Sequence, residues 1–365
     1  DGGNILANHN DFQNRATVIA GDTSGLSDHA THVAGTVGSR GTHTGMAPEV
    51  TILSAGFEWD GSGTFLYTNP GDFEADYTDA IALGADLSNN SIGTNTAPNG
   101  FDCDITGDYG VMSSLIDAAV LGSLGGDIVV FWANGNERQT TRCGSTYSTT
   151  APPATAKNHI TVGALNANND TVTSFTSWGP VDDGRLKPDI AAPGSSTLGD
   201  GGITSTSSGG GYSVKSGTSL ASHAAAGCGG LSIDDWRNQF PGEGNPRNAT
   251  VKALRAQDAQ DVGNPGPDYQ TGYGSIRVLD SIDTLRAGRV SEDSVGAGAS
   301  RSYRMPVSAG ETFKVTIAWD DAPGVPNTTK ALVNDLDLRV FDPAGNRVFP
   351  WTLDPASPGL PATQD

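Results

Sequence analysis

HATHVAGT at residues 29–36 and KSGTSLAS at residues 215–222 are the two stretches that carry most information about this chain. The first begins with His29, and the second places Ser219 between a glycine turn and a small-residue helical stretch. A serine hydroxyl is a poor nucleophile at neutral pH, so it needs a base nearby and a third group that orients the base. The two stretches therefore predict a nucleophilic serine and a histidine base.

Composition excludes several classes of protein. The 365 residues suffice for one large domain and part of a second. No apolar run approaches the roughly 18 residues that span a bilayer, so we expect no membrane association. The formal net charge of -20 repels nucleic acid and anionic membranes. The same charge suggests a salt-exposed extracellular protein, which a salt series of activity and melting temperature would test.

Strand and helix patterns alternate along the first three quarters of the chain. We expect strands at residues 16–19, 51–55, 127–132 and 159–162, and helices at residues 29–37, 77–83, 110–121 and 219–227. This alternation predicts an α/β fold with a doubly wound, mostly parallel sheet. Sites in such sheets gather where loops leave the carboxyl ends of the strands.

The residue pattern changes from about residue 290, where short alternations of apolar and polar residues replace helical patterns. Residues 311–319 and 332–341 read as strands, and residues 343–346 read as a turn. We expect a larger domain at residues 1–287, whose N-terminal strand is missing, and a smaller, truncated all-β domain at residues 288–365.

The two motifs resemble those of the subtilisin-like serine proteases, the subtilases. GTSLASHAAAG at residues 217–227 is similar to the family's serine motif, and further matching stretches extend the resemblance over about residues 1–285. It implies a secreted, monomeric serine endopeptidase of protein or peptide substrates, with Ser219 as nucleophile and His29 as general base. ALVNDLDL at residues 331–338 is similar to the C-terminal jelly-roll domain of some bacterial members.

The resemblance implies an aspartate upstream of the histidine, since the family's chain order is Asp, His, Ser. Asp1-Gly2-Gly3 resembles the family's Asp-Ser/Thr-Gly element, so Asp1 is the expected third member. Asp11, Asp22 and Asp28 lack the glycine pattern and are interpreted as solvated loop carboxylates. Because no strand precedes Asp1, we expect the natural protein to extend upstream.

Acyl transfer also needs donors for an oxyanion. FWANGNE at residues 131–137 resembles the family's AAGNEG, which implies Asn136 as the side-chain donor and the Ser219 amide as the second. Asn134 is the nearby rival. By the same resemblance an extended substrate would pair with backbone, and the residues implied are Ser91, Ile92, Gly93, Gly61, Ser62, Gly63, Ala133, Asn134 and Gly135.

Three positions depart from the family motifs. Ala30 adds a methyl group beside the histidine, His223 replaces a proline, and Leu220 replaces a methionine. None removes a reacting atom, and leucine resists the oxidation to which a thioether is exposed. His32 is interpreted as a buried structural histidine, and His223 is not expected to act as a base.

The cysteines and carboxylates suggest few further sites. Cys103 and Cys143 lie in loops and could pair, whereas Cys228 is expected to be a buried free thiol. The chemistry requires no cofactor. Calcium is common in the family. The candidate ligands for a structural ion are Asp320, Asp321, Asp335 and Asp337. An equal alternative is that these four are solvated surface carboxylates.

Two other functions remain open. A sedolisin-type carboxyl peptidase also carries an SGTS serine on a related fold, but it uses glutamate where this chain has the HATHVAGT histidine. A catalytically inactive descendant that binds peptides or serves a structural role is the second alternative, and labelling of Ser219 by an activity probe would separate it from an enzyme.

Overall fold

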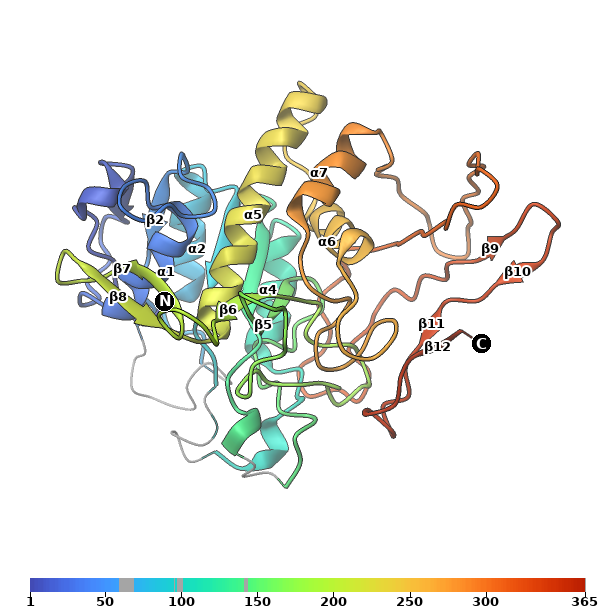
Figure 1. Cartoon of the computed structure of the whole chain (residues 1–365), viewed down its shortest axis with the longest axis horizontal. Helices are drawn as coiled ribbons and strands as arrows, with labels where there is room; N and C mark the ends of the chain where they lie inside the picture. The colour runs from blue at the N-terminus through green and yellow to red at the C-terminus, as the bar shows by residue number, and fades with distance from the viewer. Residues whose placement is uncertain (59–68, 95, 97–100, 141–143, 365) are drawn as a thin grey trace.

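A four-stranded parallel sheet forms the centre of the molecule. The computed structural model describes residues 1–58, 69–94, 96, 101–140 and 144–364. Strands β3, β4, β5 and β6 lie side by side in that order, and all three pairings are parallel. Their bounds are Leu87–Asn90, Val129–Ala133, Ile160–Asn166 and Ile190–Ser195. Helices flank this sheet (Figure 1), as the alternation of patterns predicts.

Strand β4 explains why the sheet is covered on both faces. Alternate side chains of a strand point to opposite faces of the sheet. All five residues of β4 are buried, so both faces are covered at this strand. Val130 and Trp132 pack with residues of α2 (Phe73–Ala82) and α4 (Val111–Val120). Val129 and Phe131 pack with residues of α5 (Thr218–Gln239). Burial on both faces gives the continuous apolar run that marks a central parallel strand.

Helix α5 is the longest helix among the described residues and runs across one face of the sheet (Figure 1). Its Gly229 lies so close to β4 that an added Cβ would be 2.7 Å from the Phe131 ring. Helices α6 (Asn248–Asp258) and α7 (Val278–Arg286) pack against each other, and α7 also packs against α5. The small residues of α5 thus allow the close approach that fixes its N-terminus over the sheet edge.

A hairpin brings the two sequence motifs together. Helix α1 (Asp28–Gly38) packs against β7 (Ile203–Thr206), which pairs with β8 (Tyr212–Lys215) immediately before α5. A Cβ on Gly35 of α1 would lie 2.2 Å from the Thr206 hydroxyl, so this contact requires glycine. The hairpin therefore joins the histidine helix to the segment that carries Ser219.

The remaining N-terminal elements form a smaller unit beside α1. Strands β1 (Ala16–Val18) and β2 (Ile52–Ser54) pair in parallel.

Short 3-10 helices occupy Asn10–Phe12, Cys103–Ile105 and Arg138–Thr140. Within the described ranges, no helix is long and apolar enough to cross a membrane.

The C-terminal segment differs from the expected run of strands. Residues 311–319 form no strand, and of residues 332–341 only Val340–Phe341 (β9) is paired. Phe313, one of the apolar residues of this pattern, is 46% exposed. An alternating apolar pattern forms a strand only where a neighbouring strand supplies hydrogen bonds. Strand β9 pairs with β10 (Arg347–Val348), and β11 (Trp351–Thr352) pairs with β12 (Thr363–Gln364). The turn expected at residues 343–346 is confirmed by the hydrogen bond from the Asp342 N–H to the Asn346 carbonyl.

Candidate active site

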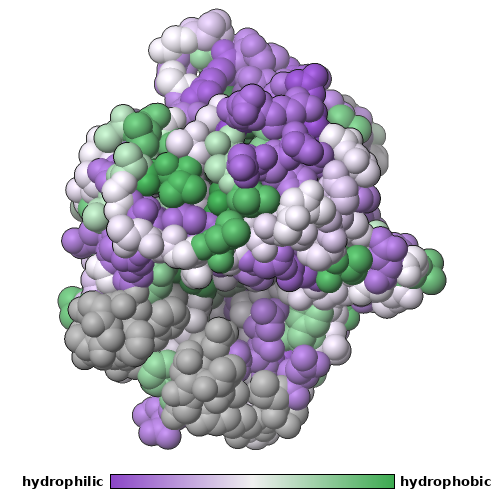
Figure 2. Space-filling view, turned by 90° about the vertical axis from the view of Figure 1, so that its left-hand side faces the viewer, coloured by the Kyte–Doolittle hydropathy of each residue, from purple (hydrophilic) through white to green (hydrophobic). Residues whose placement is uncertain are grey.

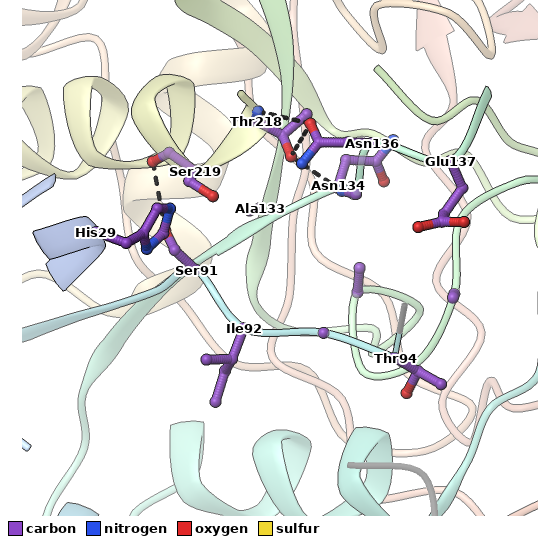
Figure 3. Close-up of a pocket in the computed structure, with 14 residues that line it drawn as sticks. His29, Ser91, Ile92, Thr94, Ala133, Asn134, Asn136, Glu137, Thr218 and Ser219 are labelled. Atoms are coloured by element: carbon purple, nitrogen blue, oxygen red, sulfur yellow. Dashed lines mark hydrogen bonds between the residues drawn. The ribbon is translucent and has the colours of Figure 1, made fainter. Parts of the chain in front are cut away.

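A cavity of about 280 Å³ lies at the carboxyl end of the sheet. His29 comes from α1, Ser219 from α5, and the other walls follow β3 and β4 (Figure 3). This is the edge at which parallel sheets gather their sites. The lining residues are His29, Ser91, Ile92, Gly93, Thr94, Ala133, Asn134, Gly135, Asn136, Glu137, Ala151, Ala154, Thr218 and Ser219.

Asp1 contacts the histidine of the cavity. Its Oδ2 lies 2.8 Å from Nδ1 of His29, and its Oδ1 accepts a hydrogen bond from the Gly2 N–H at 2.6 Å. Gly3, at φ +140°, lies where a Cβ would be 2.8 Å from the Gly25 carbonyl oxygen, so the glycine of this element is required sterically. Since a carboxylate can only accept, Nδ1 carries the proton and Nε2 of His29 is left as an acceptor.

Burial lowers the pKa of His29 to about 4, and the positive charge of Lys215 acts in the same direction. The carboxylate of Asp28 opposes this shift, and so does the adjacent carboxylate of Asp1, because a negative neighbour favours imidazolium. A lowered pKa keeps the imidazole neutral, and therefore able to accept a proton, well below pH 6.

Ser219 is the second residue of α5 and is 8% exposed. Its N–H is one of the first four in the helix, which have no intrahelical partner. Ser219 and His29 line the same cavity, and Figure 3 shows them at the same end of it. Among the described residues the Ser219 hydroxyl has no hydrogen-bond partner. Such contacts often tighten only when substrate binds.

Asn136 is held by Thr218, the residue before Ser219. The Thr218 N–H and hydroxyl donate to Oδ1 of Asn136 at 3.0 and 3.1 Å, and the same hydroxyl accepts from the Gly135 N–H at 3.2 Å. Gly135 has φ +102°, a conformation that favours glycine after the strand. With Oδ1 fixed in this way, Nδ2 of Asn136 is the end of the amide that remains to donate.

The rival Asn134 is fully buried and already used at both ends of its amide. Its Nδ2 donates to the Ser177 carbonyl at 2.5 Å, and its Oδ1 accepts from the Thr150 hydroxyl at 3.1 Å. The backbone of residues 133–135 and of residues 91–93 lines two sides of the cavity. Gly61, Ser62 and Gly63 lie outside the described residues.

The competing aspartates are engaged elsewhere. Asp11 accepts from the Tyr212 hydroxyl, and Asp22 accepts from Asn4, Ser24 and Gly56. Asp28 pairs with Lys215 at 2.8 Å and accepts from the Ser208 N–H at 2.8 Å. Of the four candidate acids, Asp1 is the one in contact with Nδ1 of His29.

The structure also describes Ala30, His32 and two of the three cysteines. Ala30 is 2% exposed and packs with Phe12 and Ala34, so its methyl group fills a small core. His32 is buried, with Nε2 3.0 Å from the Ile203 and Ser213 carbonyl oxygens. Cys228 is a buried free thiol, and Cys103 is disulfide-bonded. Its expected partner, Cys143, lies outside the described residues.

Each of the four carboxylates considered for calcium has a protein partner. Asp320 accepts from Asn248 and the Ala249 N–H, and Asp321 accepts from Lys157 and the Val333 N–H. Asp335 and Asp337 pair with Lys330 and Arg339. Within the part of the chain that the structure describes, no group of three or more histidine, cysteine or carboxylate side chains is arranged to hold a metal ion.

Several cavity residues were not identified from the sequence. Thr218 lies inside the serine motif, yet nothing in the motif indicates that it holds Asn136. Thr94, Glu137, Ala151 and Ala154 also line the cavity. Ala151 and Ala154 come from a loop, and small loop residues carry no periodic signal.

Fold and site together define an α/β protein with a serine, a histidine and an aspartate gathered at the carboxyl edge of a parallel sheet. Residues 6–274 match the family model for Peptidase_S8, the subtilase family. The chain therefore belongs to the subtilase family. Asp1 precedes the matched region, so its assignment rests on its contact with His29.

Curated relatives agree with this family. A thermophilic serine proteinase of Bacillus sp. (strain AK1) is 30% identical over 72% of this chain and 53% of its own length. Serine protease AprX of Bacillus subtilis (strain 168) is 31% identical over 70% of this chain and 57% of its own length. The chain thus spans about half the length of these curated relatives.

Solved structures share the fold. The prenylagaramide maturation protease PagA superposes with a TM-score of 0.59 at 24% identity, covering 78% of this chain and 91% of that protease. A cold adapted subtilisin-like serine proteinase superposes with a TM-score of 0.50 at 24% identity, covering 76% of this chain and 84% of that structure. These likenesses confirm the expected subtilisin-like α/β fold.

Proposed function

We propose that the protein is a serine endopeptidase that hydrolyses protein or peptide substrates through an acyl-enzyme on Ser219. The observation that carries this proposal is the 2.8 Å contact between Asp1 Oδ2 and His29 Nδ1, with His29 and Ser219 on one cavity. Asp1 fixes the tautomer that leaves Nε2 of His29 facing outward as a base. Membership of the subtilase family supports the same reaction.

The proposed reaction assigns one role to each group. The Ser219 hydroxyl attacks the scissile carbonyl carbon while Nε2 of His29 takes its proton, and Asp1 stabilises the resulting imidazolium. The oxyanion accepts hydrogen bonds from Asn136 Nδ2 and the Ser219 N–H. Collapse returns the proton from His29 to the leaving amine. Water, activated by the same histidine, then releases the acid from Ser219.

We propose that the substrate binds as an extended strand between residues 91–93 and residues 133–135. Both segments line the cavity, and backbone pairing suits an enzyme that cuts many sequences.

The remaining proposals concern the whole protein. The disulfide at Cys103 and the net charge of -20 support secretion into an oxidising, salt-exposed setting. The antiparallel pairs β9–β10 and β11–β12 support a C-terminal β domain of the jelly-roll kind at residues 288–365. We propose a monomer that needs no cofactor for the chemistry.

Hydrolysis of an unstructured protein such as casein tests the function. Wild-type protein should generate internal fragments identifiable by mass spectrometry, whereas Ser219→Ala and His29→Ala should lose the activity by several orders of magnitude while remaining folded. Equal fragment yields from wild type and Ser219→Ala would contradict the proposal, and no fragments from folded wild-type protein would favour an inactive, peptide-binding descendant.

A further inference from the structure

His223 occupies a position where the family motif has proline, four residues after Ser219 on α5. Its side chain is buried, being only 7% exposed. The proposed mechanism does not use this histidine. Its ring nevertheless lies between the nucleophile and the segment that follows β3, so its contacts connect two parts of the site.

Three polar atoms meet at this point. Nδ1 of His223 lies 2.8 Å from the Ser219 carbonyl oxygen and 3.0 Å from the Ser91 hydroxyl oxygen. The Ser91 hydroxyl in turn donates to the same Ser219 carbonyl at 3.3 Å. Because a carbonyl oxygen can only accept, Nδ1 of His223 carries the proton. The Ser219 carbonyl therefore receives two side-chain donors from different elements.

His223 serves this geometry as a neutral group. Burial lowers its pKa to about 3, although the hydrogen bond to the Ser219 carbonyl opposes that shift. The Asn89 side-chain amide contacts both ring nitrogens, 2.8 Å from Nδ1 and 2.9 Å from Nε2. The imidazole thus contacts the end of β3, the Ser91 hydroxyl and the Ser219 carbonyl from its place on α5.

We propose that His223 is a positioning residue: its Nδ1–H ties the Ser91 wall of the substrate cavity to the backbone of Ser219. This inference rests on the proposed function and extends it. A substrate paired with residues 91–93 is placed correctly relative to the Ser219 hydroxyl only if residues 91–93 are held firmly against the start of α5. Misplacement by about 1 Å can cost on the order of 100-fold in rate.

Asparagine and glutamine at position 223 separate this role from simple packing. The amide nitrogen of asparagine is bonded to Cγ, as Nδ1 is, whereas that of glutamine lies one bond further out, at the level of Nε2. We expect His223→Asn to keep kcat/KM for an internally quenched peptide within about threefold, and His223→Gln to lower it about tenfold, mainly through kcat. Both melting temperatures serve as the folding control.

A small reagent supplies the readout that a general structural role would not separate. A fluorophosphonate reacts with Ser219 without using the Ser91 wall, so its labelling rate should stay within about threefold in wild type and both variants. If His223→Gln slows labelling as much as peptide hydrolysis, the coupling to the wall is wrong. Equal peptide activities of the Asn and Gln variants, high or low, would also overturn it.

Ser91 gives an independent arm should the glutamine variant fail to fold. Ser91→Ala should lower peptide kcat/KM about tenfold and leave fluorophosphonate labelling within about threefold. In the double variant with His223→Gln the losses should not multiply, since both remove one contact. Full multiplication of the two losses, or unchanged peptide activity in Ser91→Ala, would refute the proposal. Absence of labelling in wild type would instead refute the proposed function.

Discussion

Thr218 holds the side-chain oxygen of Asn136 with two hydrogen bonds, one from its backbone N–H at 3.0 Å and one from its hydroxyl at 3.1 Å. The residue next to the proposed nucleophile therefore orients the proposed oxyanion donor. The two functions are coupled through one turn at the start of α5.

The first prediction concerns that hydroxyl. Thr218→Val keeps the volume of a fully buried side chain but removes one bond to Asn136 and the acceptor of the Gly135 N–H. We expect kcat to fall about tenfold with KM nearly unchanged, less than the 100- to 1000-fold typical of losing an oxyanion donor. Steady-state kinetics measure this effect. Thr218→Ser, which retains the hydroxyl, should recover most of the rate, and a serine variant as slow as valine would contradict the role.

The second prediction concerns the pH dependence. Because burial and Lys215 lower the pKa of His29 to about 4, kcat/KM should fall only as the pH drops toward 4, where the base becomes protonated. Lys215→Met removes a positive charge and should move this acidic limb to higher pH. Asp28→Asn removes a negative charge and should move it to lower pH, since the pKa of Asp28 lies at about 2 and the group is ionised throughout.

Both shifts should be smaller than about one pH unit, because Lys215 and Asp28 are partly exposed and solvent screens them. The measurement is kcat/KM from pH 3 to 8 at fixed ionic strength. Shifts of the two variants in the same direction would show that their charges do not act on His29.

The third prediction concerns oxidation. Leu220 is 1% exposed and follows Ser219 directly, so a methionine there would place a thioether beside the nucleophile. Leu220→Met should retain activity in the absence of oxidant, because the two side chains have similar volume. It should lose activity in hydrogen peroxide several times faster than wild type. Equal inactivation rates would show that another residue limits oxidant resistance.

The fourth prediction concerns the C-terminal segment. Lys157 and Asp321 are 4% and 2% exposed, and their charged atoms lie 2.7 Å apart. Asp321→Asn should lower the free energy of unfolding by about 3 kcal/mol, because it leaves a buried ammonium without its nearest charge. Urea unfolding monitored by tryptophan fluorescence measures the change. Asp337→Asn, which alters the exposed pair with Arg339, is the matched control and should leave the midpoint unchanged.

The exposed apolar residues are distributed unevenly over the surface. Figure 2 shows hydrophobic patches separated by hydrophilic surface on the face that carries the N-terminal elements. The exposed Leu26 and Val214 belong to the N-terminal and hairpin segments. Substitutions at buried positions, such as Thr218 and Leu220, avoid changing this surface.

The sequence predicts those parts of the fold whose signal is local. The apolar run of β4 and the small residues of α5 are recognisable because burial on both faces and close helix packing restrict their composition. Strand β3 reads LSNN and carries no local strand signal, since its polar side chains are satisfied only in the tertiary structure. Residues 311–319 show the opposite error, because alternation of apolar residues does not supply a pairing partner.

The site divides in the same way. Specific motifs indicate His29, Ser219 and Asn136, and the structure places all three on one cavity. Only a three-residue element indicates Asp1, and its contact with His29 arises only through folding. The links made by Thr218, Lys215 and His223 join segments far apart in the chain, so no local pattern could have indicated them.

Activation of the Ser219 nucleophile by His29 is the step on which the proposed function depends. The most direct measurement is labelling with a fluorophosphonate probe, followed by mass spectrometry of the peptide that contains residue 219, in wild type, Ser219→Ala and His29→Ala. We expect a stoichiometric adduct on Ser219 in wild type and at most trace labelling in both variants. Labelling of Ser219→Ala equal to that of wild type, or no adduct on folded wild-type protein, would contradict it.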